Sequence, residues 1–154
     1  MMKARAELQP IGEIHVQLGE RIKVGSGPKG TRWIFDVISV EIIGDRINAN
    51  LAIGDAADWL TLSNDGSVGS VDVRFTLKTH DDAYIYVEYA GRADMGTGMI
   101  AVAPTFQTGD PRYAWLNKIQ AVGAGILRPS GQLVYSLYEV VISCASPPDP
   151  ASEQ

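Results

Sequence analysis

Polar and apolar residues alternate along most of this chain, with the period of two that is typical of β-strands. The alternating segments are rich in β-branched and aromatic residues, which favour strands. No segment shows the 3.6-residue period of an amphipathic helix three turns long. The pattern predicts nine strands, at residues 13–18, 33–43, 46–53, 59–63, 68–79, 83–91, 99–107, 115–127 and 133–143.

Short turns separate these segments. Asp65-Gly66 is a strong hairpin signal, and Gly109-Asp110-Pro111 and Pro129-Ser130-Gly131 are further turns. Strands joined by tight turns run antiparallel, so the sequence predicts an all-β fold. We expect a single antiparallel up-and-down β-barrel of about 8–9 strands with a central pocket, with a β-sandwich as the alternative.

Glycine favours the barrel over the sandwich. The chain has 16 glycines, and several lie inside predicted strands, where strongly bent barrel strands need them. These mid-strand positions are Gly69, Gly91, Gly123 and Gly125. A length of 154 residues indicates one domain, which we place at residues 1–143. Residues 144–154 contain three prolines and are expected to form a disordered tail.

Charge and composition exclude several classes of function. The net charge is -5, so neither nucleic acid nor an anionic membrane surface is an expected partner. The N-terminus lacks the continuous apolar segment of a secretory signal, so the cytoplasm is the expected compartment. The only two histidines, His15 and His80, have no metal-ligand spacing to each other or to the single cysteine, Cys144, so no metal site is expected.

The strand at 68–79 presents a polar face. Asp72, Arg74 and Thr76 alternate with apolar residues. Either this face meets solvent, or it points into the barrel, where an Asp–Arg pair would hold the guanidinium ready for a substrate carboxylate. The alternation alone is consistent with both arrangements.

Asp58 and Trp59 open another strand. An Asp at such a position is ordinarily a turn or capping residue. Beside a Trp at the edge of a pocket it could instead have a raised pKa and act as a general acid or base.

Residues 112–117, Arg-Tyr-Ala-Trp-Leu-Asn, are the richest stretch in polar and aromatic side chains. If they form a strand, Tyr113, Trp115 and Asn117 share one face. Such a face suits a flat ligand with polar edges, although aromatic residues on a buried face are more often core.

Seven motifs in order resemble the bacterial domain of unknown function 3237 family, also called uncharacterised protein family 0311. They are Gly25-Ser-Gly-Pro-Lys-Gly-Thr-Arg32, Ala57-Asp-Trp59, Asp72-Val-Arg-Phe-Thr-Leu-Lys-Thr79 with Asp81-Asp-Ala83, Ile85-Tyr-Val87, Pro104-Thr-Phe-Gln-Thr108, Arg112-Tyr-Ala-Trp-Leu-Asn117 and Val134-Tyr-Ser-Leu-Tyr138. The resemblance covers residues 7–143.

The resemblance implies an antiparallel β-barrel, usually a homo-oligomer (dimer or tetramer), with no metal or organic cofactor. Some members are labelled as lyases acting on 4-hydroxylaminobenzoate. The family's motif positions are occupied here by Asp58, Trp59, Asp72, Arg74, Arg112, Tyr113, Trp115 and Asn117. Two segments depart from the family pattern: residues 54–58 lack the paired glycines common before Asp-Trp, and residues 92–99 are shorter than usual.

These observations lead to two functional hypotheses. The first is a cofactor-independent lyase, isomerase or cyclase that acts on an aromatic or cyclic, anionic metabolite by general acid–base catalysis inside the barrel. Asp58 or Asp72 would move the proton, and Arg74 or Arg112 would hold the anionic group. Trp59 and Trp115 would pack the ring, with Tyr113 and Asn117 also among the binding residues. The alternative is a non-catalytic barrel that binds a hydrophobic small molecule or a partner protein.

Overall fold

The computed structural model describes residues 2–145. It contains ten strands and one short 3₁₀ helix, η1. Their bounds are β1 Lys3–Gly27, β2 Gly30–Gly44, β3 Asn48–Leu51, β4 Ala57–Leu62, β5 Val68–Thr79, β6 Tyr84–Asp94, β7 Met99–Val102, β8 Thr105–Gln107, η1 Pro111–Lys118, β9 Ala121–Leu127 and β10 Gln132–Ala145. Residues 2–145 contain no helix that is long and apolar enough to cross a membrane.

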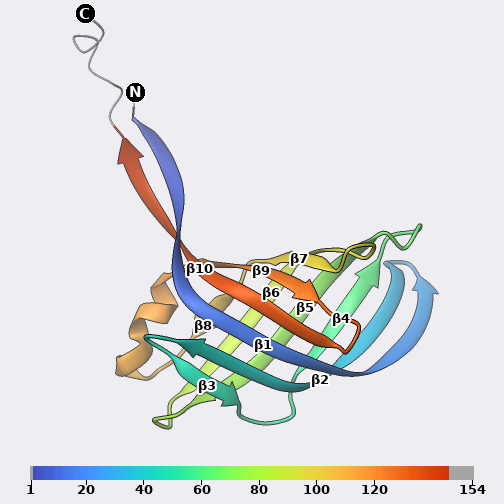
Figure 1. Cartoon of the computed structure of the whole chain (residues 1–154), viewed down its shortest axis with the longest axis horizontal. Coiled ribbons are helices and arrows are strands. Elements are labelled where there is room, and N and C mark those ends of the chain that lie inside the picture. Colours follow the sequence, from blue (N-terminus) through green and yellow to red (C-terminus); the bar gives the residue numbers. More distant parts are fainter. Residues whose placement is uncertain (1, 146–154) are drawn as a thin grey trace, which may run out of the picture.

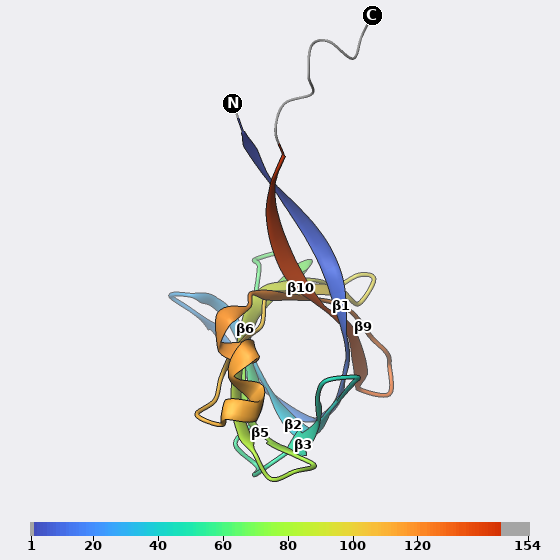
Figure 2. The same cartoon turned by 90° about the vertical axis from the view of Figure 1, so that its left-hand side faces the viewer.

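Eight strands close into a ring, and every pairing is antiparallel (Figures 1 and 2). Around the ring the order is β1, β2, β4, β5, β6, β7, β9 and β10, and β10 pairs with β1 to close it. Consecutive ring strands are neighbours throughout, so the predicted up-and-down barrel is confirmed. The short strands β3 and β8 pair with this ring, β3 with β2 and β5 and β8 with β6.

The strand β5 shows why alternation builds this barrel. Val71, Val73, Phe75 and Leu77 are at most 4% exposed, whereas the residues between them are partly or fully exposed. A period of two directs every second side chain into the ring, where apolar side chains are removed from water.

The mid-strand glycines lie where inner-face side chains approach the backbone closely. A Cβ added to Gly125 would lie 2.5 Å from Cδ1 of Tyr135, and one at Gly91 would collide with the carbonyl oxygen of Ala101. Glycine, the residue without a Cβ, is therefore required at both positions, because of these close contacts.

The segment before β9 differs from its prediction. Residues 111–118 form the helix η1 instead of the start of a strand. Asp110 caps this helix by accepting a hydrogen bond from the backbone N–H of Arg112, and Pro111 occupies the first turn, where its missing N–H has no cost. The predicted strand at 99–107 is likewise divided into β7 and β8.

A two-stranded arm projects from the barrel and carries both ends of the described chain (Figures 1 and 2). We define the arm as residues 3–9 of β1 paired with residues 139–145 of β10. Cys144 lies in this arm and is exposed. The predicted tail therefore begins within a strand, and its remaining residues, 146–154, lie outside the described residues.

The two ends of the barrel are closed differently. At one end, which we call the plugged half, η1 lies against the rim, and inner-face residues such as Ile42, Leu77, Ile85 and Leu116 are at most 1% exposed (Figure 2). At the other end lies the turn between β1 and β2. There the inner-face side chains of Trp33, Phe35 and Asp58 are only partly buried, and we call this the open half.

Candidate functional site

Asp58 points toward the barrel interior. It lies on β4 with the same parity as the buried Leu60 and Leu62, and in the sheet it stands opposite Phe35 of β2 and Val73 of β5. Directly opposed residues in antiparallel strands share a face, so the carboxyl group lies among apolar inner-face side chains.

Burial raises the pKa of Asp58 to about 7. The negative charge of Asp72 raises it further, whereas a hydrogen bond from the backbone N–H of Asp72 to Oδ1 of Asp58, at 3.1 Å, lowers it. Removal of water from the carboxylate outweighs the single hydrogen bond, because a charged group loses more by leaving water than one N–H donor restores. Asp58 therefore exchanges its proton near neutral pH.

Two tyrosines lie near Asp58 on the inner face. Tyr89 and Tyr135 are 4% and 1% exposed, and their ring centroids are 5.8 Å apart in an edge-to-face arrangement. Burial raises the pKa of both hydroxyls, and the negative charge of Asp58 adds to the effect. Both remain neutral phenols at physiological pH and can donate hydrogen bonds.

Toward the open end, two cations contact one indole. The Arg21 guanidinium carbon lies 4.5 Å from the ring centroid of Trp33, and Nζ of Lys23 lies 5.1 Å from it. Phe35 packs edge-on to Trp33 at a centroid distance of 6.5 Å. The open half thus combines a titrating carboxyl group, an aromatic pair and positive charge, and the two buried phenols lie on the same inner face.

The polar face of β5 lies outside the barrel. Asp72 and Arg74 are exposed, and the Arg74 guanidinium lies 4.8 Å from the ring of Trp59, which also faces outward. Thr76 donates a hydrogen bond to Asp55 on the same surface. The hypothesis that this face lines an interior pocket is wrong, because the apolar residues of β5 occupy the inner positions.

Side chains of η1 hold this helix against the rim of the barrel. Arg112 forms ion pairs with Asp110, at 2.8 Å, and with Asp81, at 3.2 Å. The hydroxyl of Tyr113 donates to Oδ1 of Asp81 at 2.7 Å. Arg112 is thus paired with two carboxylates of its own chain.

Trp115 and Asn117 also make contacts within the fold. The guanidinium of Arg46 stacks 3.7 Å from the ring of Trp115. Asn117 accepts from the N–H of Thr108 and donates to its carbonyl oxygen, at 2.8 and 2.9 Å. The predicted common face of residues 113, 115 and 117 does not exist, because the segment is helical, and the structure brings none of these residues to Asp58.

Five inner-face residues were missed from the sequence: Arg21, Lys23 and Trp33 of the open half, and the buried Tyr89 and Tyr135. Arg21 and Lys23 alternate with Ile22 and Val24, a pattern equally typical of an ordinary solvent-facing strand. The one available signal was the presence of two cations of equal parity on a strand that leads into a glycine-rich turn.

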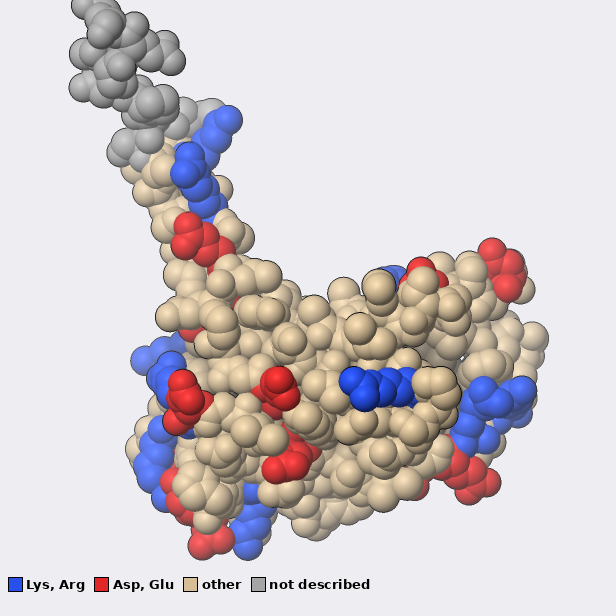
Figure 3. All heavy atoms as spheres, viewed as in Figure 1, with Lys and Arg blue, Asp and Glu red and all other residues tan. Residues whose placement is uncertain are grey.

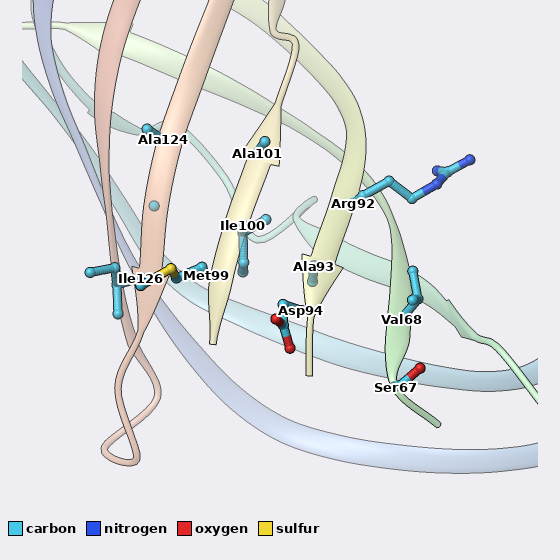
Figure 4. Close-up of a pocket in the computed structure, with 11 residues that line it drawn as sticks. Ser67, Val68, Arg92, Ala93, Asp94, Met99, Ile100, Ala101, Ala124 and Ile126 are labelled. Carbon is cyan, nitrogen blue, oxygen red and sulfur yellow. The ribbon is translucent and has the colours of Figure 1, made fainter. Parts of the chain in front are cut away.

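No three His, Cys, Asp or Glu side chains among residues 2–145 come together in a group that could hold a metal ion. A hollow of about 750 Å³ lies on the outer surface of β5, β6, β7 and β9 (Figure 4). Its lining includes Met99, Ala101 and Ile126. It is separate from the inner face that carries Asp58.

Comparison with known proteins agrees with this architecture. A β-barrel-like protein from Acinetobacter baumannii is 23% identical, with a TM-score of 0.79 over 89% of this chain and 97% of its own. A conserved protein of unknown function from Rhodopseudomonas palustris is 21% identical, with a TM-score of 0.80 over 89% of this chain and 99% of its own. A protein from Penicillium herquei described as an enzyme is 20% identical, with a TM-score of 0.65 over 90% of this chain and 95% of its own.

Sequence comparison identifies the family. A protein from Rhodopseudomonas palustris strain TIE-1, named only as a UPF0311 protein, is 22% identical over 91% of this chain and its own full length. The model of the family described as "Protein of unknown function (DUF3237)" matches residues 6–140. The resemblance seen in the seven motifs is confirmed, and the chain belongs to the DUF3237 family.

Proposed function

We propose that this protein is a cofactor-independent enzyme of the lyase, isomerase or cyclase type, and that Asp58 moves the proton. The observation that carries the proposal is an inward-facing, desolvated carboxyl group with a pKa of about 7. General acid–base catalysis works best when the pKa of the group is close to the working pH, because both protonation states are then available. The structurally related Penicillium herquei protein, described as an enzyme, is consistent with a catalytic role for this fold.

The surroundings of Asp58 fit an aromatic or cyclic, anionic substrate. Trp33 and Phe35 offer ring faces and edges on the inner side, and Tyr89 and Tyr135 offer neutral donors for an oxygen on which charge develops. These residues take the roles that the sequence gave to Trp59 and Trp115, whose rings stack with cations outside this region.

The alternative role for Asp58 is structural, since its carboxylate accepts the Asp72 N–H between β4 and β5. Asp58→Asn separates the two roles because the amide oxygen still accepts that bond but the group no longer titrates. We expect the variant to remain folded and to lose about 10²- to 10⁴-fold in turnover. Turnover is assayed first with 4-hydroxylaminobenzoate, on which some members of the family are labelled as acting.

Asp36→Asn is the matched control, because Asp36 is an exposed carboxylate on the neighbouring strand β2 and faces outward. It should leave turnover unchanged. Full activity in Asp58→Asn would refute the acid–base role. Binding of aromatic acids without turnover in the wild type would support the non-catalytic alternative instead.

We also propose that two copies of this chain associate through the arm. Among residues 2–145 no third strand pairs with the arm, and Leu8 and Ile142 are 57% and 63% exposed on it. An isolated two-stranded ribbon is only marginally stable in water, so a further covering surface would stabilise it.

The same chain offers such a surface at the foot of the arm. A hollow of about 420 Å³ is lined by Leu8 and Tyr138 together with small side chains of β6, β7 and β9, and it shares Arg92, Ala101 and Ala124 with the larger outer hollow. In the view of Figure 3 the surface that borders the angle between arm and barrel is formed mainly by residues other than Lys, Arg, Asp and Glu. Lys3 and Arg5 near the arm's end complement Asp94 in the outer hollow, and two identical copies can satisfy both contacts at once.

Sedimentation of Leu8→Asp/Ile142→Asp tests the association. We expect a dimeric wild type and a monomeric variant, because a buried carboxylate without a partner is costly. Ile53→Asp, at a site that is 65% exposed outside the arm and the hollows, should remain dimeric. A monomeric wild type would overturn this part of the proposal.

A further inference from the structure

Arg21 and Lys23 lie on the inner side of the open half. In the β1–β2 ladder they stand opposite Phe35 and Trp33, whereas Ile22 between them stands opposite Ile34 and is 57% exposed on the outer side. Both cationic side chains therefore share the face that carries Asp58, and both are exposed to solvent at the barrel's open end.

Neither cation is paired with a carboxylate among the described residues 2–145. The ion pairs of this part of the chain involve His15, Lys78 and Arg112. Two positive charges side by side repel each other, and an anion placed between them removes that repulsion and gains charge-assisted hydrogen bonds.

Trp33 holds the cations without neutralising them. The guanidinium of Arg21 and the ammonium of Lys23 lie 4.5 and 5.1 Å from its ring centroid, within the range of a cation–π contact. An ion pair would use up their N–H donors, whereas an aromatic face leaves those donors directed elsewhere. Trp33 is thus a positioning residue for two available positive charges.

The register relates these charges to Asp58. Arg21 pairs with Phe35, and Phe35 pairs with Asp58, so Arg21 and Asp58 lie two strands apart on one face. Two strand spacings correspond to about 10 Å between their backbones. A ligand that reaches both groups needs an acid group at one end and its reacting atom on the far side of a ring or similar spacer.

We propose that Arg21 and Lys23 are the specificity-determining residues that bind the acid group of a planar organic acid, with Trp33 holding them in place. The inference rests on the proposed function, because it orients the substrate toward Asp58. Arg21 and Lys23 thus take the role of holding the anionic group, which the sequence had suggested for Arg74 or Arg112. The net charge of -5 makes local positive charge more important, because the protein as a whole repels anions.

Binding of benzoate and 2-naphthoate, compared with their neutral amides, tests the site without knowledge of the substrate. Affinity is measured by calorimetry at low salt for the wild type and for Arg21→Gln/Lys23→Gln. We expect the double variant to bind the acids about 10- to 100-fold more weakly and the amides unchanged, because charge-assisted hydrogen bonds are lost only with the acids. Lys29→Gln removes one charge from the turn of the same hairpin, and it should change neither the affinity for the acids nor that for the amides.

Three outcomes would overturn the inference: no binding of either acid by the wild type, equal affinity in the double variant, or an equal loss in Lys29→Gln. Its failure is distinguishable from that of the proposed function. If NMR shows Asp58 titrating near pH 7 while the double variant binds the acids as tightly as the wild type, only the assignment of Arg21 and Lys23 is refuted. If the acids bind through Arg21 and Lys23 but Asp58 titrates in the ordinary carboxyl range, only the acid–base role fails.

Trp33→Leu tests the positioning role separately. It keeps both charges and an apolar side chain but removes the aromatic face. We expect weaker acid binding together with a steeper dependence on salt, because freely moving cations attract anions only through screened long-range charge. Unchanged affinity and salt dependence would show that Trp33 does not position the cations.

Discussion

The plugged half and the open half of the barrel are built from the same eight strands, with the same inward and outward alternation. In the plugged half inner positions such as Ile42, Leu77 and Ile85 carry aliphatic side chains, and these and Leu116 of η1 are at most 1% exposed. In the open half the inner positions carry Trp33, Phe35 and Asp58, and η1, the helix of the described part of the chain, lies at the opposite end. The comparison shows that one strand pattern can support both a stability-determining core and a polar inner surface.

The open half also holds a group that opposes folding. Desolvation of Asp58 disfavours its charged form, so the protein retains a carboxyl group where an apolar side chain would be more stable. The buried polar residues among residues 2–145 are Thr79 and Thr108, and neither carries a carboxylate. Such a local cost is typical of functional sites that the rest of the fold supports.

The largest predicted effect concerns the plugged half. Leu116→Ala leaves a cavity beneath η1, and we expect it to lower the free energy of unfolding by about 2–5 kcal/mol, because Leu116 is 1% exposed. Urea denaturation measures the change. Benzoate affinity of the folded variant should stay at the wild-type value, and a loss of affinity parallel to the loss of stability would show that the two halves are not independent.

The next effect concerns the pH dependence of stability in the open half. The folded pKa of Asp58, about 7, lies above its ordinary value of 3.8, so the folded state binds this proton more tightly than the unfolded state. The resulting stability is fully present below about pH 4 and is lost as the pH rises through 7. Asp58→Asn lacks this loss, and above pH 7 we expect it to be about 2 kcal/mol more stable than the wild type, allowing for partial solvent access to the carboxyl group.

Urea denaturation across this pH range measures how the free energy of unfolding changes with pH. Asp36→Asn is again the control and should show the same pH dependence as the wild type. Equal slopes for wild type and Asp58→Asn would mean that Asp58 has an ordinary pKa in the folded protein. The open half would then carry no destabilised carboxyl group, and the contrast between the halves would be lost.

The smallest predicted effect sharpens the role of Asp72. Its backbone N–H bonds to Asp58, while its outward-facing carboxylate raises the pKa of Asp58. Asp72→Asn keeps the N–H and removes the charge, so the pKa of Asp58 should fall slightly, as observed by NMR titration. A large loss of turnover with an unchanged Asp58 pKa would instead restore Asp72 as a catalytic residue in its own right.

Much of the fold could be predicted because period-two alternation and turn residues are local properties. Residues 68–79 were predicted as a strand and form β5 with the same bounds, and Gly66 adopts the positive φ of 75° that its hairpin turn requires. Residues 111–118 were mispredicted, since an apparently alternating Tyr-Ala-Trp-Leu sequence also fits a short 3₁₀ helix once Asp110 and Pro111 start it.

The candidate site was predictable only in part. Asp58 could be singled out by its position beside Trp59, but its raised pKa depends on burial inside the closed ring and on the charge of Asp72, which lies on another strand. Arg21 and Lys23 could not be recognised, because an exposed cation on a strand has the same local pattern whether it faces open solvent or the mouth of a barrel.

The sequence by itself determined the strand pattern, the antiparallel order and the places where glycine is required, because each depends on the backbone and on neighbouring residues. Only the tertiary structure decided which face of each strand turns inward and which residues from β1, β2, β4, β6 and β10 meet. Closure of the ring sets that choice: it places Asp58 out of water and leaves Asp72 and Arg74 in it, although all three occupy family motif positions.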